Sequence, residues 1–201
     1  MKTLFYEHLN TYKIYYLFNL GVFVGGILFG FFYVNYQTEA EISTLSMNIT
    51  EMLNGQYIQN KSYVSHHLTE TLFILSIIYI LSMSIVAIPI LPIILFYKSM
   101  QIGFTAALYI KIFSYKGIFG IIMTIMPYII FEIIAYFSSF AIAYEVSLSL
   151  AITSFIKKQT LDLKEVVKHL FNNFIWSLCF ILLSVLTQIY VLPQLFRLFV
   201  R

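Results

Sequence analysis

The sequence predicts an all-α fold, a polytopic transmembrane helical bundle of about five spans in a single integral membrane domain over residues 1–201. Hydrophobic residues fill 60% of the positions and charged residues only 10%, whereas soluble domains carry about 25% charged residues. The charges fall between apolar runs of about the 20 residues that a helix needs to cross a bilayer. We therefore expect membrane lipid around most of the chain. A net charge of +3 without a dense basic segment excludes a nucleic-acid partner.

The first span is predicted at residues 14–36, which carry no charge. Two small-xxx-small spacings, Gly21 to Gly25 and Gly26 to Gly30, allow another helix backbone to approach closely. We expect these four glycines to pack against a neighbouring helix. No small-residue cleavage pattern follows the run, so we expect a retained anchor.

The next segment, residues 37–71, is predicted to be an outer loop, because external loops are poor in Lys and Arg and this one is acidic. Ile42 and Leu45 begin a helical period, which indicates a short amphipathic helix at the outer surface. His66 and His67 are expected to be solvated. Adjacent side chains on a helix diverge by about 100°, so these two cannot easily share a metal ion.

Residues 72–97 are predicted to form the second span. Pro89 and Pro92 each remove a helical hydrogen bond, so this span is expected to kink or end near Leu91. Lys98 is expected to cap the span at the inner surface.

The third span is predicted at residues 99–113. This apolar run is short, so a re-entrant hairpin over residues 99–126 stays open as an alternative to a full crossing. Gly103 lies within the run and is expected to permit close packing against another helix.

The fourth span is predicted at residues 117–145, as a helix broken near Pro127, because the apolar run exceeds one crossing. Glu132 is its most informative residue. An ionisable side chain near the bilayer centre costs at least about 2.5–3.5 kcal/mol, so Glu132 must face protein or water. Two interpretations stay open: a functional site, or a structural carboxyl group that satisfies backbone groups freed at Pro127. Glu145 is expected at the membrane interface.

A cytoplasmic basic loop is predicted over residues 156–173 and the last span over residues 174–199. The basic side chains expected to make a cytoplasmic contact are Lys157, Lys158, Lys164 and Lys168. Thr160 is expected to cap an amphipathic helix on the inner leaflet. Counting the crossings puts the N-terminus inside and the C-terminus outside.

Catalytic motifs are missing from the sequence, which holds no G-x-x-x-x-G-K-[ST], no G-x-S-x-G and no H-E-x-x-H. The one cysteine, Cys179, lies in an apolar run and is expected to be a small buried hydrophobe. We therefore predict that the chain is not an enzyme and has no catalytic residue, metal or cofactor.

Three blocks of sequence, in this order and spacing, resemble the stage II sporulation protein M family. They are Pro89 to Thr105, with the basic Lys98 and Gly103-Phe104-Thr105; Pro127 to Ala135, with Glu132; and Gln188 to Pro193. The glycine-rich first span also fits this family. The chain departs from the family pattern at Tyr128 and Ile129, where the family has His and Gly, and at Gln188, where it often has Glu.

The resemblance implies a non-enzymatic scaffold or anchor for peptidoglycan-remodelling proteins during engulfment of the forespore. The implied partners are stage II sporulation proteins D and P, and the implied location is the septal or engulfing membrane of the mother cell. A homodimer is a further candidate that the sequence leaves open. The alternative function is a permease-like membrane subunit of an ATPase-coupled transport system, in which residues 157–168 would contact the ATPase.

Overall fold

The structure, a computed structural model, describes residues 13–53, 61–157, 163–192 and 194–195. Within these residues every regular element is helical, and five helices are long and apolar enough to cross a membrane. The predicted all-α bundle of five spans is confirmed. The elements are α2 (Lys13–Tyr33), η1 (Val34–Tyr36), α3 (Glu39–Leu53), α4 (Lys61–Ser82), α5 (Ala87–Phe113), α6 (Tyr115–Gly120), η2 (Ile121–Ile125), α7 (Met126–Ile152), η3 (Thr153–Lys157), α8 (Leu163–Leu186) and η4 (Thr187–Val191).

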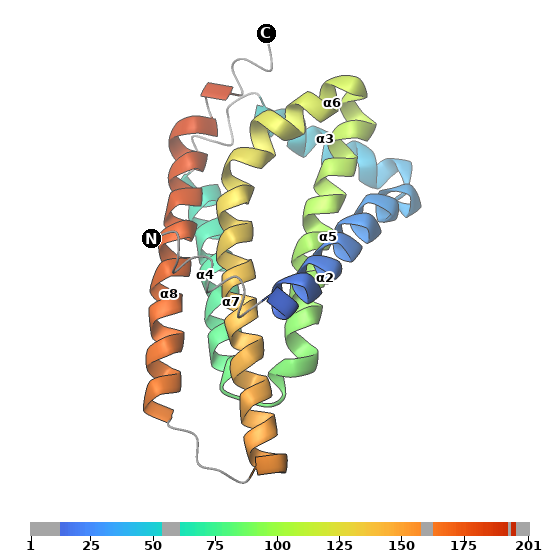
Figure 1. Ribbon diagram of the computed structural model, residues 1–201. Coiled ribbons are helices and arrows are strands. Elements are labelled where there is room, and N and C mark those ends of the chain that lie inside the picture. The colour runs from blue at the N-terminus through green and yellow to red at the C-terminus, as the bar shows by residue number, and fades with distance from the viewer. Residues whose placement is uncertain (1–12, 54–60, 158–162, 193, 196–201) are drawn as a thin grey trace.

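The spans alternate in direction between the two ends of the bundle. Figure 1 shows α3 and α6 at one end, and the turn between α4 and α5 at the other. The polar helix α3 and the basic start of α8 therefore lie at opposite ends, as the predicted topology requires. Which end faces the cytoplasm stays a prediction.

Three glycines form the contact between α2 and α5, which cross closely in Figure 1. A Cβ atom on Gly26 would overlap the Ser99 side chain, and one on Gly30 would overlap the carbonyl oxygen of Met100. From the other side, a Cβ atom on Gly103 would overlap the carbonyl oxygen of Ile27. Hydrogen is the only substituent that permits this approach.

The other two glycines of the first span lie outside this contact. A Cβ atom on Gly21 or Gly25 would meet no heavy atom within 4 Å. The predicted helix packing therefore applies to the Gly26 to Gly30 spacing and, within this chain, not to the Gly21 to Gly25 spacing. Only one side of α2 faces α5, and an offset of five residues turns the first pair away from it.

The predicted outer amphipathic helix is present as α3, whose Leu45 packs against buried residues at the end of the bundle. A capping box begins the helix. The backbone N–H and the hydroxyl group of Thr38 both donate to a carboxylate oxygen of Glu41 at 2.9 Å, and the N–H of Glu41 donates back to the Thr38 hydroxyl at 3.4 Å.

The first turn of α3 is expected to depend on pH. Hydrogen bonds from Thr38 lower the pKa of Glu41 below its ordinary range. A carboxyl group with a lowered pKa contributes stability above its ordinary range and loses it as the pH falls through the lowered pKa. The protection of the α3 amides against hydrogen exchange, taken relative to the intrinsic rate at each pH, should therefore fall toward acid, and Glu41→Gln should weaken that pH dependence. Glu39→Gln, at an exposed site in the same turn, is the control. An equal response of the two variants would contradict the role of Glu41.

The boundary between the second and third spans lies earlier in the chain than the sequence predicted. Helix α4 ends at Ser82 and α5 begins at Ala87, so the predicted boundary near Leu91 and Lys98 is wrong. Pro89 falls in the first turn of α5, where a backbone N–H has no helical partner, and α5 continues through Pro92. The 27-residue α5 is long enough for a full crossing. The alternative of a re-entrant hairpin over residues 99–126 is therefore not needed.

The predicted break near Pro127 takes the form of a π-helical turn. Residues Ile121–Ile125 form η2, and Pro127 then stands at the start of α7. Figure 1 shows the chain bending between α6 and α7. The span does not end at Glu145, which is half-buried within α7. The apolar run exceeds one bilayer thickness, so the bend and the length of α7 accommodate the surplus.

The predicted cytoplasmic loop is shorter than residues 156–173. The last span begins at Leu163, so the amphipathic segment and the span form one continuous helix, α8. Lys164 and Lys168 are exposed on its first turns, and Lys158, Thr160 and Pro193 lie outside the described residues. Cys179 is exposed on α8, so its predicted burial is wrong: it lies two residues, about 200° around the helix, from the buried Ser177.

Candidate functional site

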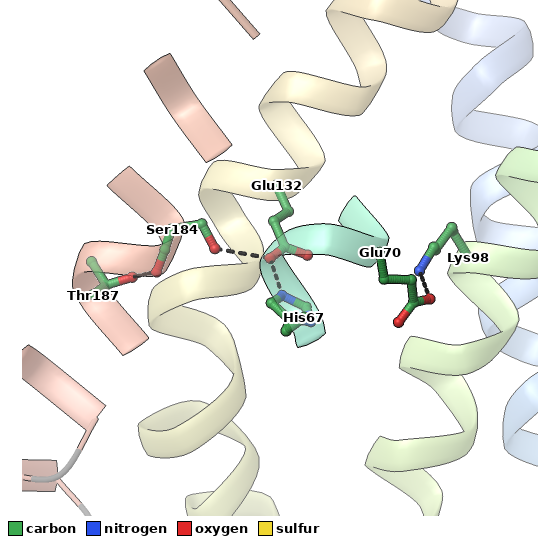
Figure 2. Close-up of polar contacts among 6 residues, drawn as sticks. All are labelled: His67, Glu70, Lys98, Glu132, Ser184 and Thr187. Atoms are coloured by element: carbon green, nitrogen blue, oxygen red, sulfur yellow. Dashed lines mark hydrogen bonds and ion pairs between the residues drawn. The ribbon is translucent and has the colours of Figure 1, made fainter. Parts of the chain in front are cut away.

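Glu132 is buried within the bundle, with 8% of its surface exposed. Its Oε1 atom accepts a hydrogen bond of 2.9 Å from the Ser184 hydroxyl of α8 and lies 2.7 Å from Nε2 of His67 in α4 (Figure 2). One carboxylate oxygen thus joins three helices. Its partners are side chains of α4 and α8, so the predicted structural role of satisfying backbone groups near Pro127 is not the one that these contacts describe.

His67 was expected in a solvated outer loop, and this prediction is wrong. Helix α4 begins at Lys61, so residues 61–70, which include His67, form its first turns. His66 is exposed, as predicted, but His67 faces Glu132 with only 21% of its side chain exposed. Helical spacing offered a signal, because His67 and Glu70 are three residues apart and share one face of a helix.

A second ion pair lies one turn along the same helix. The Lys98 ammonium group of α5 donates to a carboxylate oxygen of Glu70 at 2.6 Å, and 13% of the Lys98 side chain is exposed (Figure 2). Lys98 is therefore not a cap at the inner surface. It lies eleven residues into α5, about 16 Å along the helix, where a charge needs a partner.

The two pairs line one pocket of about 140 Å³ between α2, α4, α5 and α7. Its polar lining also includes Gln101, Thr105, Tyr128 and Tyr136, and apolar side chains such as Phe23 and Leu95 complete the wall. Ionisable side chains that converge on a cavity in a membrane protein mark a site of function by default. This pocket is the candidate functional site.

The Glu70–Lys98 pair is expected to show coupled stability effects. Lys98→Met leaves a carboxylate without its cation, whereas Glu70→Leu combined with Lys98→Met removes both charges. We expect the double variant to unfold at a higher temperature than Lys98→Met, with a coupling free energy within about 0.5–3 kcal/mol. Thermal unfolding of the four members of this cycle in lipid nanodiscs measures it. Additive effects would show that the two side chains act independently.

A second polar group holds α4, α7 and α8 together toward the other end of the bundle. The Tyr79 hydroxyl donates to Oδ1 of Asn173 at 3.1 Å and lies 3.1 Å from the Ser139 hydroxyl. The hydroxyl groups of Ser139 and Ser177 are 2.7 Å apart. This group was not predicted from the sequence, although Asn173, Ser177 and Ser184 of α8 and Gln188 of η4 follow a helical period.

An apolar layer separates this second group from Glu132. Leu75 of α4, Ala135 of α7 and Ile181 of α8 are each 0% exposed and pack together. Beyond Ser184, Gln188 of η4 is buried, and its side-chain oxygen has no hydrogen-bond partner among the described residues. Polar contacts between α7 and α8 thus occur in two separate places. One of them is at Glu132, which lines the charged pocket.

A metal site is not formed by the side chains that the structure describes, since no three His, Cys, Asp or Glu residues come together there. The lysines predicted to make a cytoplasmic contact lie far along the chain from the pocket. Lys164 and Lys168 are on the first turns of α8, and Lys157 ends η3. Of the predicted site residues, Glu132 lies in the pocket and Gly103 lies on the pocket-lining helix α5.

Comparison with known proteins identifies the family. The model of stage II sporulation protein M matches residues 19–193, which is most of the chain and reaches all five spans. The chain belongs to the stage II sporulation protein M family. No curated protein and no solved structure gave a match.

Tyr128 of α7 lies beside His67 in the pocket. Its ring is edge-on to the His67 ring, with centroids 6.0 Å apart. Nε2 of His67 lies 2.7 Å from Oε1 of Glu132. The imidazole of α4 thus contacts both a ring and a carboxyl group of α7.

Proposed function

We propose that this sporulation-related membrane protein is a non-enzymatic scaffold that holds peptidoglycan-remodelling proteins during engulfment of the forespore. The family match carries the proposal. The proposed partners are stage II sporulation proteins D and P, and the proposed location is the septal or engulfing membrane of the mother cell. Multi-pass insertion, which five apolar helices support, would fix such a scaffold in that membrane.

Helix α3 is the surface best placed for a partner outside the membrane. It lies at one end of the bundle (Figure 1), is fixed there by Leu45 and begins with the exposed acidic residues Glu39 and Glu41. Met47 is 67% exposed on this helix. A large exposed apolar side chain beside polar ones is the kind of anchor that interfaces bury.

Affinity capture of the full-length protein from sporulating cells tests the proposal. We expect recovery of both wall-remodelling partners with the wild-type chain, and a loss of roughly tenfold or more for Met47→Asp, because a hot-spot side chain contributes about 2 kcal/mol or more. Lys168→Ser, at the opposite end of the bundle, is the matched control and should retain full recovery. Absence of both partners from the wild-type capture would refute the scaffold function.

A permease-like subunit of an ATPase-coupled transport system is the second candidate, and the charged pocket favours it. Paired charges near the middle of a span line substrate pathways in transporters. This function predicts the opposite pattern: Lys168→Ser would reduce recovery of a cytoplasmic ATPase, and Met47→Asp would not. The same pair of variants therefore separates the two functions.

A further inference from the structure

The charges of the pocket balance only with one additional positive charge. Two carboxyl groups, Glu70 and Glu132, line it against one permanent cation, Lys98. The Lys98 ammonium is engaged with Glu70, so Glu132 depends on its other neighbours. Ser184 is neutral, and His67 is positive only when it is protonated. Since a bare carboxylate inside a membrane is costly, the pocket has a place for one positive charge.

Two oxygen atoms in the pocket have no hydrogen-bond partner among the residues that the structure describes. Both hydrogen bonds to Glu132 reach Oε1, and Figure 2 shows the other carboxylate oxygen turned toward the Glu70–Lys98 pair. The Tyr136 side chain, only 7% exposed, also lines the pocket, and its hydroxyl group has no hydrogen-bond partner among the described residues. The Thr71 hydroxyl of α4 lies near this hydroxyl. A buried polar atom without a partner indicates that something else satisfies it.

The rest of the wall suits an organic cation. The rings of Phe23, Tyr128 and Tyr136 line the same pocket, and aromatic faces attract ammonium groups. The volume of about 140 Å³ is close to that of an engineered cavity that holds benzene, so it admits roughly six heavy atoms. We propose that the pocket binds the ammonium group of a small organic amine, between the free oxygen of Glu132, the Tyr136 hydroxyl and these rings.

Other ligand classes fit less well. An anion, or a zwitterion that enters whole as glycine would, would place a negative charge beside two carboxyl groups, and the only permanent cation in the pocket is already paired with Glu70. A divalent metal ion would need more oxygen or nitrogen ligands than the described side chains bring together. The proposal does not rest on the scaffold function, and either can fail without the other.

Binding of an amine is expected to compete with a proton. His67 and the ligand would supply the same missing charge, so protonation of His67 should weaken binding by placing two cations at one carboxylate. The titratable groups that face this place from the surrounding helices are His67 and Glu70 of α4, Lys98 of α5, and Tyr128, Glu132 and Tyr136 of α7. Imidazole changes charge between pH 5 and 8, whereas these other types ordinarily do so outside that range.

Methylammonium chloride is the probe, added to the full-length protein in phosphatidylglycerol nanodiscs. We expect it to raise the unfolding temperature at pH 8 and much less at pH 5, and to bind saturably in calorimetry. Sodium chloride, sodium acetate and glycine at equal concentration should give no such shift. An equal shift from any of these three, or none from methylammonium, would overturn the proposal.

Variants locate the binding in the pocket. Glu132→Gln should abolish the methylammonium shift, and Glu145→Gln, on the same helix outside the pocket, should retain it. Tyr136→Phe removes only the unpartnered hydroxyl, so it should fold and yet bind methylammonium about tenfold more weakly. If Glu132→Gln does not fold, Tyr136→Phe still tests whether the amine binds in this pocket. His67→Gln should bind equally at pH 5 and pH 8. Unchanged affinity in Tyr136→Phe would contradict the assigned site.

The amine has two possible sources, a free molecule or the headgroup of phosphatidylethanolamine. Adding this lipid to the nanodiscs distinguishes them. A headgroup occupant would stabilise the protein by itself and leave little further shift from methylammonium. With a free amine as the natural ligand, the lipid would have no effect and the methylammonium shift would persist.

Discussion

Replacing Gly30 by leucine is expected to separate α2 from α5. Any Cβ atom at this position would overlap the carbonyl oxygen of Met100 and lie 2.8 Å from the backbone nitrogen of Phe104. Backbone atoms of a helix cannot move aside as a flexible side chain can, so α2 must shift as a whole. The cost should reach or exceed the upper end of the range of about 1–3 kcal/mol for overpacked sites.

Gly21→Leu is the matched control for Gly30→Leu. It adds the same side chain to the same helix, at an exposed position where a Cβ atom meets nothing within 4 Å. Cysteine cross-linking between positions 29 and 96, where the rings of Phe29 in α2 and Phe96 in α5 have centroids 5.6 Å apart, reports the separation directly. We expect the cross-link to persist in Gly21→Leu and to be lost in Gly30→Leu. Equal cross-linking would show that the glycine contact does not hold α2 in place.

Glu132→Leu is expected to have the second large effect, because it removes the acceptor that joins α4, α7 and α8. The His67 ring and the Ser184 hydroxyl would both lose a partner inside the bundle. A buried polar group left without its hydrogen-bond partner costs about 1–3 kcal/mol. The unfolding temperature in nanodiscs should fall accordingly, and the protein level in cells should fall with it.

Glu145→Leu serves as the control for Glu132→Leu, since it makes the same change thirteen residues along the same helix, at a half-buried site away from the pocket. We expect its unfolding temperature to stay near the wild-type value. Glu132→Gln should fall between the two, because an amide keeps one acceptor oxygen and loses the charge. Equal and small effects of both leucine variants would remove Glu132 from any structural role.

The number of spans followed from the sequence because apolar length alone decides it. Lipid solvates an uncharged run of about 20 residues whatever its neighbours are. The predicted span boundaries near Lys98 and before residue 72 were wrong because they depend on contacts between helices, which apolar length does not reveal. Glu70 and Lys98 are polar in sequence and make a pair only across two helices, so their neutralisation is a property of the tertiary structure.

One residue of the candidate site, Glu132, could be predicted from the sequence. Glu132 stands alone in an apolar run, and that contrast is visible in the sequence. His67 lies in a polar stretch where an imidazole needs no explanation, so only its contact with Glu132 shows its importance. The glycines gave an intermediate result. Spacing identified both candidate pairs, but the rotation of α2, which selects Gly26 and Gly30, depends on where α5 lies.

The close crossing of α2 and α5 also constrains the order of biosynthesis. Helix α2 leaves the ribosome before its main partner, α5, because α3 and α4 lie between them in the chain. Until then α2 must persist in the lipid as a solitary helix, with its Gly26 and Gly30 surface uncovered. We therefore expect α2 to pack into the bundle only after it has been inserted into the membrane. A stall in translation before α5 would leave α2 unassociated.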